Sequence, residues 1–266
     1  MAHTPQTADR ATAPVALVTG AGRGLGVELA RSLARDGARV LVNYRASRDG
    51  AEALAAELNA EHGAGTALAL AADVTDRARV DAMLAAAQAH FGAPVTVLVN
   101  NALPEFSFNG DARATADAID YAAFQQQLTG ILGGALNTVQ AALPGMRAAG
   151  GGSVINVGTN LFQHPVVPYH DYTAAKAALL SLTRTLAADL GPDGVRVNMV
   201  SGGLLRTTDA SAATPAAVFD LIAAGTPLRR VTSPAEFADA AVFFASPASR
   251  AVTGQNLIVD GGLVMG

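Results

Sequence analysis

The sequence predicts an α/β protein in which a parallel sheet of about seven strands lies between two layers of helices. Two observations predict this fold. Short, uniformly apolar runs alternate with longer alanine-rich stretches along the chain. The apolar runs lack an alternation of polar and apolar residues, which indicates strands buried on both faces, as in a parallel sheet covered by helices.

The elements follow from this pattern in order. We expect strands at the apolar runs 15–19, 39–43, 66–72, 95–100, 153–158, 195–200 and 256–260. We expect helices from about Gly24, near 49–62, near 76–91 and near 115–148, and around the segment that contains Tyr172 and Lys176. Units of this length are typical of a doubly wound sheet. The stretch 204–226 breaks the alternation, so we expect it to form a substrate lid above the sheet edge.

The bulk composition indicates one large globular domain. The chain has 266 residues, of which 50% are hydrophobic and 15% are charged, and this suits a well-buried core. Residues 1–13 are polar, so we expect a disordered tail there and a single domain over 14–266. The tail lacks the apolar core of a signal peptide, and no apolar run reaches membrane-spanning length. We therefore expect a soluble, cytoplasmic protein.

Charge and cysteine content exclude several classes of function. The net charge is -4, so no basic face supports binding to nucleic acid. The chain contains no cysteine, which excludes disulfides, thiolate metal ligands and cysteine nucleophiles. No cluster of His, Asp and Glu has the spacing of a metal site. We expect no metal, no nucleic acid and no membrane among the partners.

A glycine-rich turn closes the first predicted strand and opens the first predicted helix. It reads TGAGRGLG, and the residues that we expect to contact a cofactor are Gly20, Gly22, Arg23, Gly24, Leu25 and Gly26. Glycines let the backbone turn sharply and approach a pyrophosphate, while a helix N-terminus supplies free N–H groups and a favourable dipole. The same letters also occur in ordinary loops, but in this strand–turn–helix context they predict a dinucleotide site.

The end of the second strand indicates which dinucleotide binds. An NAD site usually has an acidic residue there for the ribose hydroxyls, but this chain reads NYRAS, beginning at Asn43 and including Tyr44. Arg45 and Arg23 can pair with a 2′-phosphate, and Ser47 can add a hydroxyl donor. The alternative is that both arginines are solvated surface residues. We favour NADP(H) as the cofactor.

Two further strand ends carry polar residues. Asp73 and Val74 follow the third strand, where a carboxylate can accept a hydrogen bond from the adenine amino group. Asn100, Asn101 and Ala102 end the fourth strand, at the carboxyl edge where ligands of such sheets bind. Asn101 has two open interpretations, because its amide can contact the cofactor or stabilise the turn.

A tyrosine and a lysine supply acid/base chemistry. Tyr172 and Lys176 lie four residues apart and share one face of their predicted helix. A phenol alone titrates near ~10. An ammonium beside it favours the phenolate and lowers that pKa, which gives an acid/base group near neutral pH. Such pairs arise by chance on many helices, and the upstream glycine turn makes this one a functional prediction.

In combination these motifs resemble the classical short-chain dehydrogenase/reductase family over essentially residues 14 to 264. The matching segments are TGAGRGLG, DV at 73–74, NNA at 100–102, Tyr172-x-x-x-Lys176, VRVN at 195–198 and VDGG at 259–262. The resemblance implies a Rossmann-type fold, a nicotinamide cofactor and reductase activity. Within the family, the NYR-x-S segment and residues 227–246 are most similar to the 3-oxoacyl-acyl-carrier-protein reductase type.

The resemblance also implies a mechanism. The nicotinamide gives a hydride to a carbonyl carbon, and Tyr172 gives a proton to its oxygen. Lys176 lowers the tyrosine pKa and binds the nicotinamide ribose. A hydroxyl thirteen residues before Tyr172 binds the carbonyl oxygen, and here it belongs to Thr159 where serine is usual. A threonine that only packs is the alternative. The resemblance further assigns Gly203 and Thr207 to the cofactor site.

One departure from the family pattern concerns proton relay. The family usually has an asparagine in the long central helix that holds a water beside the lysine, whereas this chain has Ile131. An isoleucine cannot bind that water. Gln127 lies one turn earlier on the same face, and we hypothesise that it reaches the same space. Asn137, six residues after Ile131, is expected to face elsewhere.

The sequence therefore predicts an NADPH-dependent reductase of a ketone, such as a 3-oxoacyl thioester or polyketide-like carbonyl carried on coenzyme A or a carrier protein. The alternative is a non-catalytic NADP(H)-binding sensor or partner subunit, which Ile131 favours and the Tyr172–Lys176 pair opposes. The family is commonly tetrameric, and the apolar ending NLIVDGGLVMG suits a subunit contact. We therefore expect a homotetramer or a dimer.

Overall fold

The computed structural model describes residues 12–106, 108–206, 208, 211 and 214–265. Most of the predicted tail, part of the predicted lid and Thr207 lie outside the described residues. Ala13, at the end of the predicted tail, is buried, and its carbonyl accepts a hydrogen bond from Arg39 Nη2 at 2.7 Å. The packed chain therefore begins before the predicted boundary.

The described strands form one parallel sheet, as predicted. Its order is β3-β2-β1-β4-β5-β6-β7. The strands are β1 (Val15–Val18), β2 (Arg39–Tyr44), β3 (Ala67–Ala71), β4 (Val95–Asn100), β5 (Gly152–Thr159), β6 (Val195–Gly202) and β7 (Asn256–Val259). β1 and β2 are buried at every position, which explains why their sequences show no polar alternation. The chain order reverses between β1 and β4, where ligands of such sheets bind.

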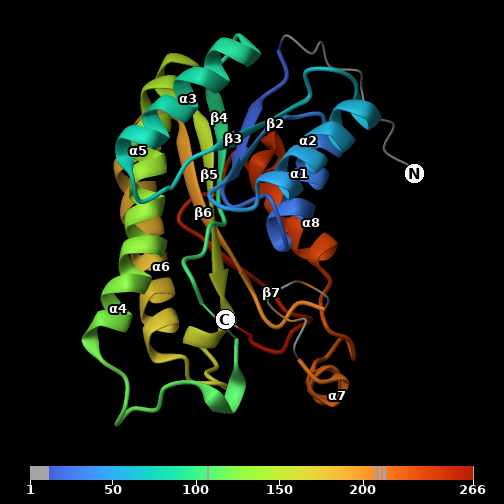
Figure 1. The fold of residues 1–266 in the computed structure, drawn as a ribbon, viewed down its shortest axis with the longest axis vertical. Coiled ribbons are helices and arrows are strands. Elements are labelled where there is room, and N and C mark those ends of the chain that lie inside the picture. The colour runs from blue at the N-terminus through green and yellow to red at the C-terminus, as the bar shows by residue number, and fades with distance from the viewer. Residues whose placement is uncertain (1–11, 107, 207, 209–210, 212–213, 266) are drawn as a thin grey trace.

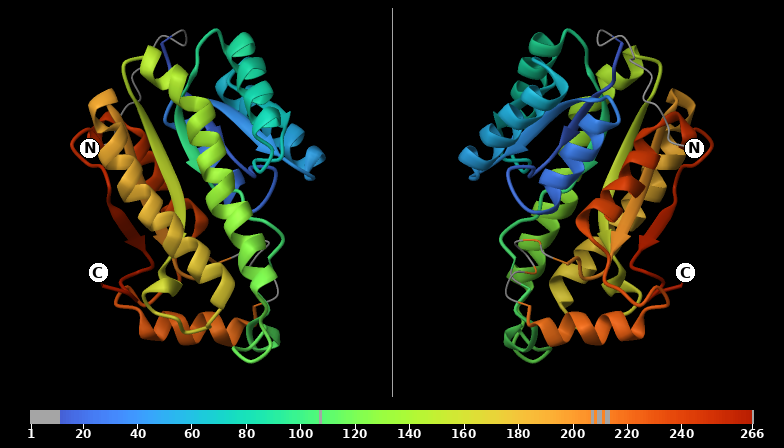
Figure 2. Two further views of the ribbon diagram at one scale, coloured as in Figure 1. Left: turned by 90° about the vertical axis from the view of Figure 1, so that its left-hand side faces the viewer. Right: turned by 90° about the vertical axis from the view of Figure 1, so that its right-hand side faces the viewer.

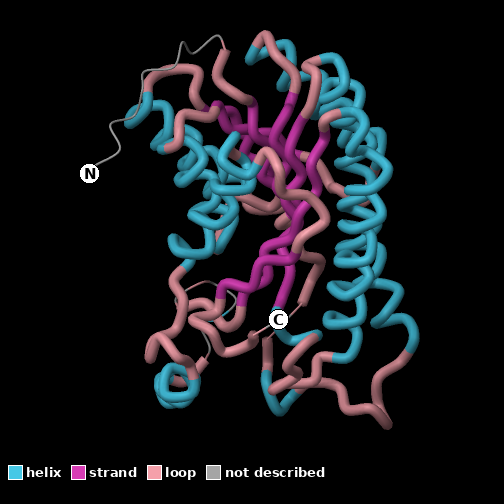
Figure 3. The backbone as a smooth tube through the Cα atoms, turned by 180° about the vertical axis from the view of Figure 1, so that it is seen from behind, coloured by secondary structure: helices cyan, strands magenta, loops and turns pink. Residues whose placement is uncertain are grey.

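Helices cover both faces of the sheet (Figures 1 and 2), and the strands lie between the two helix layers in Figure 3. One layer contains α1 (Leu25–Arg35), α2 (Arg48–His62) and α8 (Pro234–Ala245), and the other contains α3 (Arg77–Phe91), α5 (Gly134–Ala148) and α6 (His170–Leu190). Each layer has its own core, one around Leu29 and Phe237 and the other around Leu98 and Met146. Burial of these apolar faces holds the helices on the sheet.

The helix predicted near 115–148 begins later and is interrupted. α4 (Tyr121–Gln127) is followed by a wider π-type turn, η2 (Leu128–Gly133), before α5 continues the same path. A Cβ added at Gly130 would lie 2.6 Å from the Cβ of Pro104, so the close approach of this turn to Pro104 requires glycine. Such turns are frequent at functional sites.

The predicted lid contains a helix that the pattern did not indicate, α7 (Ala216–Gly225). Phe219 is the side chain that anchors it, because Phe219 is 7% exposed and lies 5.4 Å below the guanidinium of Arg206. Leu221 on the same helix is 74% exposed. That this segment acts as a lid stays a prediction.

A buried chain of hydrogen bonds connects the central strands to α5 and α6. Thr138 Oγ1 donates to Asn100 Oδ1 at 2.6 Å, and Asn100 Nδ2 donates to Asn156 Oδ1 at 2.9 Å. Asn156 Nδ2 donates in turn to Thr183 Oγ1 at 2.9 Å. All four side chains are buried. The chain of bonds fixes the end of β4 and the middle of β5 relative to α5 and α6.

We predict that Thr138→Val lowers the free energy of unfolding by roughly 1–3 kcal/mol, because it leaves Asn100 Oδ1 buried without its donor. Valine has nearly the shape of threonine, so packing is kept. The control is Thr185→Val on the exposed face of α6, expected to change stability by less than about 0.5 kcal/mol. Chemical denaturation measures both. Equal effects of the two substitutions would contradict a stabilising role for the buried chain of hydrogen bonds.

Candidate functional site

The glycine turn forms a tight cradle between β1 and α1. Gly20 and Gly24 have φ angles of 63° and 58°, in the left-handed region that favours glycine. A Cβ added at Gly26 would lie 2.6 Å from the carbonyl oxygen of Gly20, and one at Gly22 would lie 2.6 Å from that of Ser47. α1 begins at Leu25 without a side-chain cap, so its first N–H groups stay available. The turn therefore fits the pyrophosphate of a dinucleotide.

The ends of β1 and β4 are joined through one threonine. Thr19 Oγ1 accepts hydrogen bonds from the backbone N–H groups of Asn101 and Ala102, both at 2.9 Å. The same hydroxyl donates to the carbonyl oxygen of Val99 at 3.3 Å. Asn101 Nδ2 donates to the carbonyl oxygen of Thr19 at 2.8 Å. Of the two interpretations of Asn101, these contacts favour the amide that stabilises the turn.

The predicted phosphate-binding residues lie around the start of α2. Arg23 and Arg45 are exposed, and Arg45 Nη1 lies 3.8 Å from Asp73 Oδ2. Ser47 is the N-cap of α2, but its hydroxyl makes no capping hydrogen bond. Both guanidinium groups and this hydroxyl are therefore available to a ligand beside β2.

A third arginine that was not predicted from the sequence, Arg48, lies at the same place. The guanidinium of Arg48 lies 5.6 Å from the ring centroid of Tyr44, and its Nη1 lies 3.0 Å from Glu52 Oε1. Tyr44 is only 5% exposed, so it serves mainly as a packing residue at the end of β2. A basic residue so close to Arg45 in the sequence is the signal that could have revealed Arg48.

The segment after β3 is held by neighbouring side chains. Asp73 Oδ1 accepts hydrogen bonds from the N–H and the hydroxyl of Thr75, at 2.9 and 2.7 Å. Burial raises the pKa of Asp73, but these bonds and the charge of Arg45 outweigh it, so the pKa lies below its usual value. Asn137 Nδ2 donates to the carbonyl oxygen of Val74 at 2.9 Å. Asn137 thus faces away from Lys176 and supports this segment.

The three predicted catalytic residues come together at the end of β5 and the start of α6. Tyr172, Thr159 and Lys176 are 6%, 5% and 3% exposed, and Thr159 Oγ1 accepts a hydrogen bond from the N–H of Leu161 at 3.3 Å. Lys176 Nζ donates to the carbonyl oxygen of Val157 at 2.5 Å and lies 5.8 Å from the centroid of the Tyr172 ring. The hydroxyl of Thr159 lies close enough to Tyr172 to oppose the rise in the pKa of the phenol, which favours the polar interpretation of Thr159 over simple packing.

Burial controls the protonation of this group. It raises the pKa of Tyr172 to about 12, although the hydrogen bond from Thr159 acts in the opposite direction. Burial also lowers the pKa of Lys176 to about 8. The expectation that the pKa of the phenol is lowered is therefore wrong for the protein alone, because desolvation has the largest effect on Tyr172. At neutral pH the phenol holds its proton.

Aromatic side chains that the sequence analysis missed cause this burial. The ring of Phe106 stacks on Tyr172 with centroids 4.7 Å apart and an interplanar angle of 20°. Phe108 meets the same ring edge-on at 5.4 Å, and Tyr169 contacts both phenylalanines. The hydroxyl of Tyr169 accepts a hydrogen bond from the N–H of Gly110 at 2.8 Å. The segment after β4 therefore covers the phenol with aromatic rings.

Ile131 and Gln127 have different surroundings. Ile131 is 3% exposed and belongs to the apolar cluster that includes Tyr172, so no polar group from this position faces Lys176. Gln127 is 2% exposed, and its Nε2 lies 3.5 Å from the carbonyl oxygen of Glu105. The structure thus brings Gln127 to the segment after β4 rather than to Lys176, which argues against our hypothesis that it replaces the relay asparagine.

Gly203 lies where the end of β6 meets the C-terminal segment. A Cβ there would lie 2.9 Å from Nδ2 of Asn160, which donates to Asp260 Oδ2 at 2.9 Å. The Asp260 carboxylate also accepts hydrogen bonds from the N–H groups of Gly262 and Val264, both at 3.0 Å. These contacts give Gly203 a packing role beside the predicted cofactor site.

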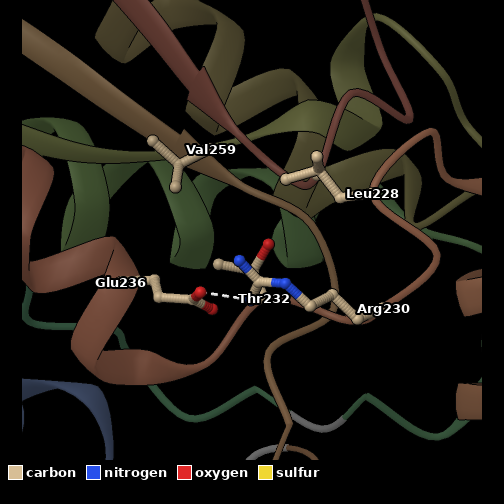
Figure 4. A pocket seen from close by; sticks show the side chains of 6 residues that line it. Leu228, Arg230, Thr232, Glu236 and Val259 are labelled. Atoms are coloured by element: carbon tan, nitrogen blue, oxygen red, sulfur yellow. Dashed lines mark hydrogen bonds and ion pairs between the residues drawn. The ribbon is translucent and has the colours of Figure 1, made fainter.

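A small cavity of about 80 Å³ lies away from Tyr172, between the start of α8 and β7 (Figure 4). Arg230 and Glu236 form an ion pair across it. Glu236 also accepts a hydrogen bond from the N–H of Ser233 and completes a capping box at the start of α8. These groups are already paired, so the cavity has a structural role.

Metal sites and membrane-spanning helices are both absent from the described residues. Within them, no group of three or more His, Asp or Glu side chains is arranged to hold a metal ion. No helix in the described part of the chain combines the length and apolar character needed to cross a membrane.

Known proteins resemble this chain over nearly its whole length. A family model described as Enoyl-(Acyl carrier protein) reductase matches residues 20–264. A D-threitol dehydrogenase from Mycolicibacterium smegmatis is 35% identical over 93% of this chain and 92% of its own. A 3-oxoacyl-acyl-carrier-protein reductase, FabG, from Staphylococcus aureus is 32% identical over 94% of this chain and 98% of its own. A gluconate 5-dehydrogenase from Burkholderia cenocepacia, solved with NADP and tartrate, superposes with a TM-score of 0.83 at 34% identity over 94% of both chains.

The buried lysine leads to a prediction about stability. The pKa of Lys176 falls from 10.5 to about 8 on folding, so burial of its charge destabilises the protein by up to roughly 3 kcal/mol at pH 7. We predict that Lys176→Met raises the free energy of unfolding at pH 7. The gain should shrink as the pH rises from about 8 to 10.5, because the wild-type lysine then loses its proton in the folded state. Denaturation at several pH values measures this, and a less stable variant at pH 7 would contradict it.

Proposed function

Because the chain belongs to the short-chain dehydrogenase/reductase family, we propose that it is an NADPH-dependent oxidoreductase that reduces a ketone to a secondary alcohol. The observation that carries this proposal is that Tyr172, Thr159 and Lys176 are buried together where β5 ends and α6 begins, with Lys176 one helical turn from Tyr172. This group lies where β5 ends, and the glycine cradle lies at the same edge of the sheet. Hydride chemistry needs a dinucleotide and a proton donor side by side.

Each residue has a defined task in this reaction. The bound nicotinamide supplies the hydride that reaches the carbonyl carbon. Tyr172 holds its proton at neutral pH and donates it from Oη to the oxygen as negative charge develops there. Thr159 donates a hydrogen bond to the same oxygen and orients it. Lys176, with its pKa near 8, carries a positive charge at neutral pH that favours the phenolate left behind.

We infer that NADPH is preferred over NADH. Arg45 and Arg48 lie at the end of β2 and the start of α2, and Arg23 follows Gly22, which lies against Ser47 there; β2 ends in Tyr44 rather than in a carboxylate. Guanidinium groups suit a 2′-phosphate, whereas the ribose hydroxyls of NADH call for an acidic acceptor. The NADP in the Burkholderia cenocepacia relative supports the same choice.

For the substrate we propose a ketone, and the relatives favour two classes. D-threitol dehydrogenase is named for a polyol, and FabG is named for a 3-oxoacyl chain on a carrier protein. Ile131 is the observation that favours a non-catalytic NADP(H)-binding protein as the second candidate function, since its apolar side chain cannot hold a relay water beside Lys176. The activity test decides between enzyme and sensor.

We also propose that the chain assembles as a homotetramer or a dimer. The C-terminal segment exposes apolar side chains, with Leu257 40% and Met265 81% exposed. Such exposure supports a contact between subunits, because apolar surface is stabilised when it leaves water. Light scattering on the full chain measures the mass of the assembly and so the number of subunits in it.

We predict that Tyr172→Phe lowers the turnover of NADPH with an accepted ketone by roughly 10²- to 10⁴-fold, the effect expected of a lost general acid. Binding of NADPH should persist. Tyr121→Phe is the control, because that phenol is 71% exposed on α4. The compounds tested as substrates should include 3-oxoacyl thioesters, cyclic ketones, hydroxylated ketones and quinones. NADPH binding without turnover of any ketone would support the sensor instead.

We predict that Arg45→Ala lowers kcat/KM for NADPH relative to NADH by roughly tenfold or more, the loss expected of one hydrogen bond to a charged group. Arg23→Ala should act in the same direction. Arg184→Ala on the exposed face of α6 is the control and should leave the ratio unchanged. Steady-state kinetics with both cofactors measures the ratio. A wild-type enzyme that uses NADH equally well would contradict the assignment.

A further inference from the structure

The carboxyl ends of β5, β6 and β7 form one row at the edge of the sheet. In the register of the three strands, Thr159 on β5 pairs with Gly202 on β6, and Gly202 pairs with Val259 on β7. The residues that follow this row are Asn160, Gly203 and Asp260. The position next to Thr159 on β5 therefore lies close to the end of β7, with only β6 between them.

The middle strand has no side chain at this level, so the two outer side chains meet across it. Asn160 Nδ2 donates a hydrogen bond to Asp260 Oδ2 at 2.9 Å. A Cβ on Gly203 would lie 2.9 Å from that nitrogen and 3.3 Å from the Cβ of Asp260, so the bond requires glycine between them. Both side chains are buried. A buried hydrogen bond to a carboxylate is stronger than one between neutral groups.

The chain after β7 holds the Asp260 carboxylate in place. Its Oδ1 accepts a hydrogen bond from the N–H of Gly262, and its Oδ2 accepts one from the N–H of Val264, both at 3.0 Å. Gly261 and Gly262 have φ angles of 74° and 85°, which a glycine adopts readily, so the chain can turn back around the carboxylate. The carboxylate is thus a fixed acceptor, and the side chain of Asn160 is anchored to it.

Asn160 in turn holds the backbone next to Thr159. It is the first residue of the short helix η3 (Asn160–Phe162), and its carbonyl oxygen accepts a hydrogen bond from the N–H of Gln163 at 3.0 Å. Thr159 is the N-cap of the same helix, and its Oγ1 accepts from the N–H of Leu161 at 3.3 Å. A hydroxyl that accepts a bond can still donate its own proton. The anchor on Asn160 therefore fixes the turn that orients the Thr159 hydroxyl.

We propose that Asp260 is a positioning residue for the reduction, and that it acts through Asn160 on the Thr159 hydroxyl that binds the carbonyl oxygen. The inference rests on the proposed function, because the place of this hydroxyl affects turnover only if Thr159 contacts the substrate. Donors to a developing oxyanion work only when they are held in place, and a small displacement costs much of their effect. The loss should therefore appear in kcat.

The test breaks the bond and then rebuilds it in the opposite direction. Asn160→Leu keeps the size and branching of the side chain but removes the donor, and it should lower kcat for an accepted ketone by roughly tenfold or more, with the KM for NADPH unchanged. Asn160→Asp combined with Asp260→Asn restores a donor and an acceptor, and kcat should return towards the wild-type value. If Asp260 served only to hold the C-terminal segment, the double variant would show no rescue, because its new amide cannot accept from both Gly262 and Val264.

Asn59→Leu is the matched control for lost stability. Asn59 on α2 exchanges two hydrogen bonds with the backbone of Ala67 on β3, at the opposite edge of the sheet from β7. This substitution should lower the midpoint of thermal unfolding and leave kcat unchanged. An unchanged kcat in Asn160→Leu, an equal loss of kcat in Asn59→Leu, or a double variant no better than Asn160→Leu overturns the proposal.

A measurement without turnover separates this proposal from the proposed function. The ¹³C-labelled methyl group of Thr159, assigned by its loss in Thr159→Ser, shares its Cβ with the hydroxyl and reports the hydroxyl's place by NMR. Its signal should shift or broaden in Asn160→Leu and return in the double variant. If the wild type reduces no ketone but the signal follows this pattern, the anchor stands and the reductase fails. If the signal keeps its wild-type position in Asn160→Leu, the anchor fails whatever the activity.

Discussion

The hydrogen bonds of Thr19 hold together the two strands between which the sheet reverses its order. Its hydroxyl accepts from the N–H groups of Asn101 and Ala102, while the Asn101 amide returns a bond to the carbonyl oxygen of Thr19. This contact places the glycine cradle after β1 beside the segment that follows β4. The cradle and the segment that covers Tyr172 therefore share one anchor, and the proposed cofactor and substrate sites depend on it.

Burial is the second constraint, and it shapes both the stability and the chemistry of the site. Phe106 and Phe108 reach Tyr172 from the segment after β4, and Ile131 closes the cluster from η2. Removal of water raises the pKa of Tyr172 and lowers that of Lys176. In the protein alone, the phenol therefore holds its proton firmly, and the neighbouring ammonium holds its proton weakly. A bound cofactor with a positively charged ring would reverse the balance at the phenol, since an opposite charge nearby favours the phenolate.

Sequence alone predicted the sheet, its layers and the strand limits to within a few residues, because apolar runs such as VALV encode burial on both faces. It also singled out Tyr172, Lys176 and Thr159, which the fold does bring together, although their roles stay predictions. Local spacing carried no sign of the stacking of Phe106 or of the π-type turn before α5. Both depend on contacts between segments far apart in the chain, such as that of Gly130 with Pro104.

The protonation of Tyr172 could not be predicted from spacing. The spacing of Tyr172 and Lys176 predicted a lowered pKa for the phenol, but spacing contains no measure of desolvation, which has the larger effect here. Gln127 was chosen for its place one turn from Ile131, yet its Nε2 lies 3.5 Å from the carbonyl oxygen of Glu105, in the segment after β4. Residue type and helical phase identify a face, whereas partners follow only from the packed structure.

The measurement that tests the account most directly is an NMR titration of Tyr172 with ring-labelled tyrosine, assigned by comparison with Tyr172→Phe, with and without NADP⁺. The account predicts a pKa well above the usual value near 10 in the protein alone, close to about 12, and a clear fall when NADP⁺ binds. A Tyr172 pKa at or below 10 in the protein alone, or one that NADP⁺ leaves unchanged, would contradict the account of a buried phenol that exchanges its proton beside the cofactor.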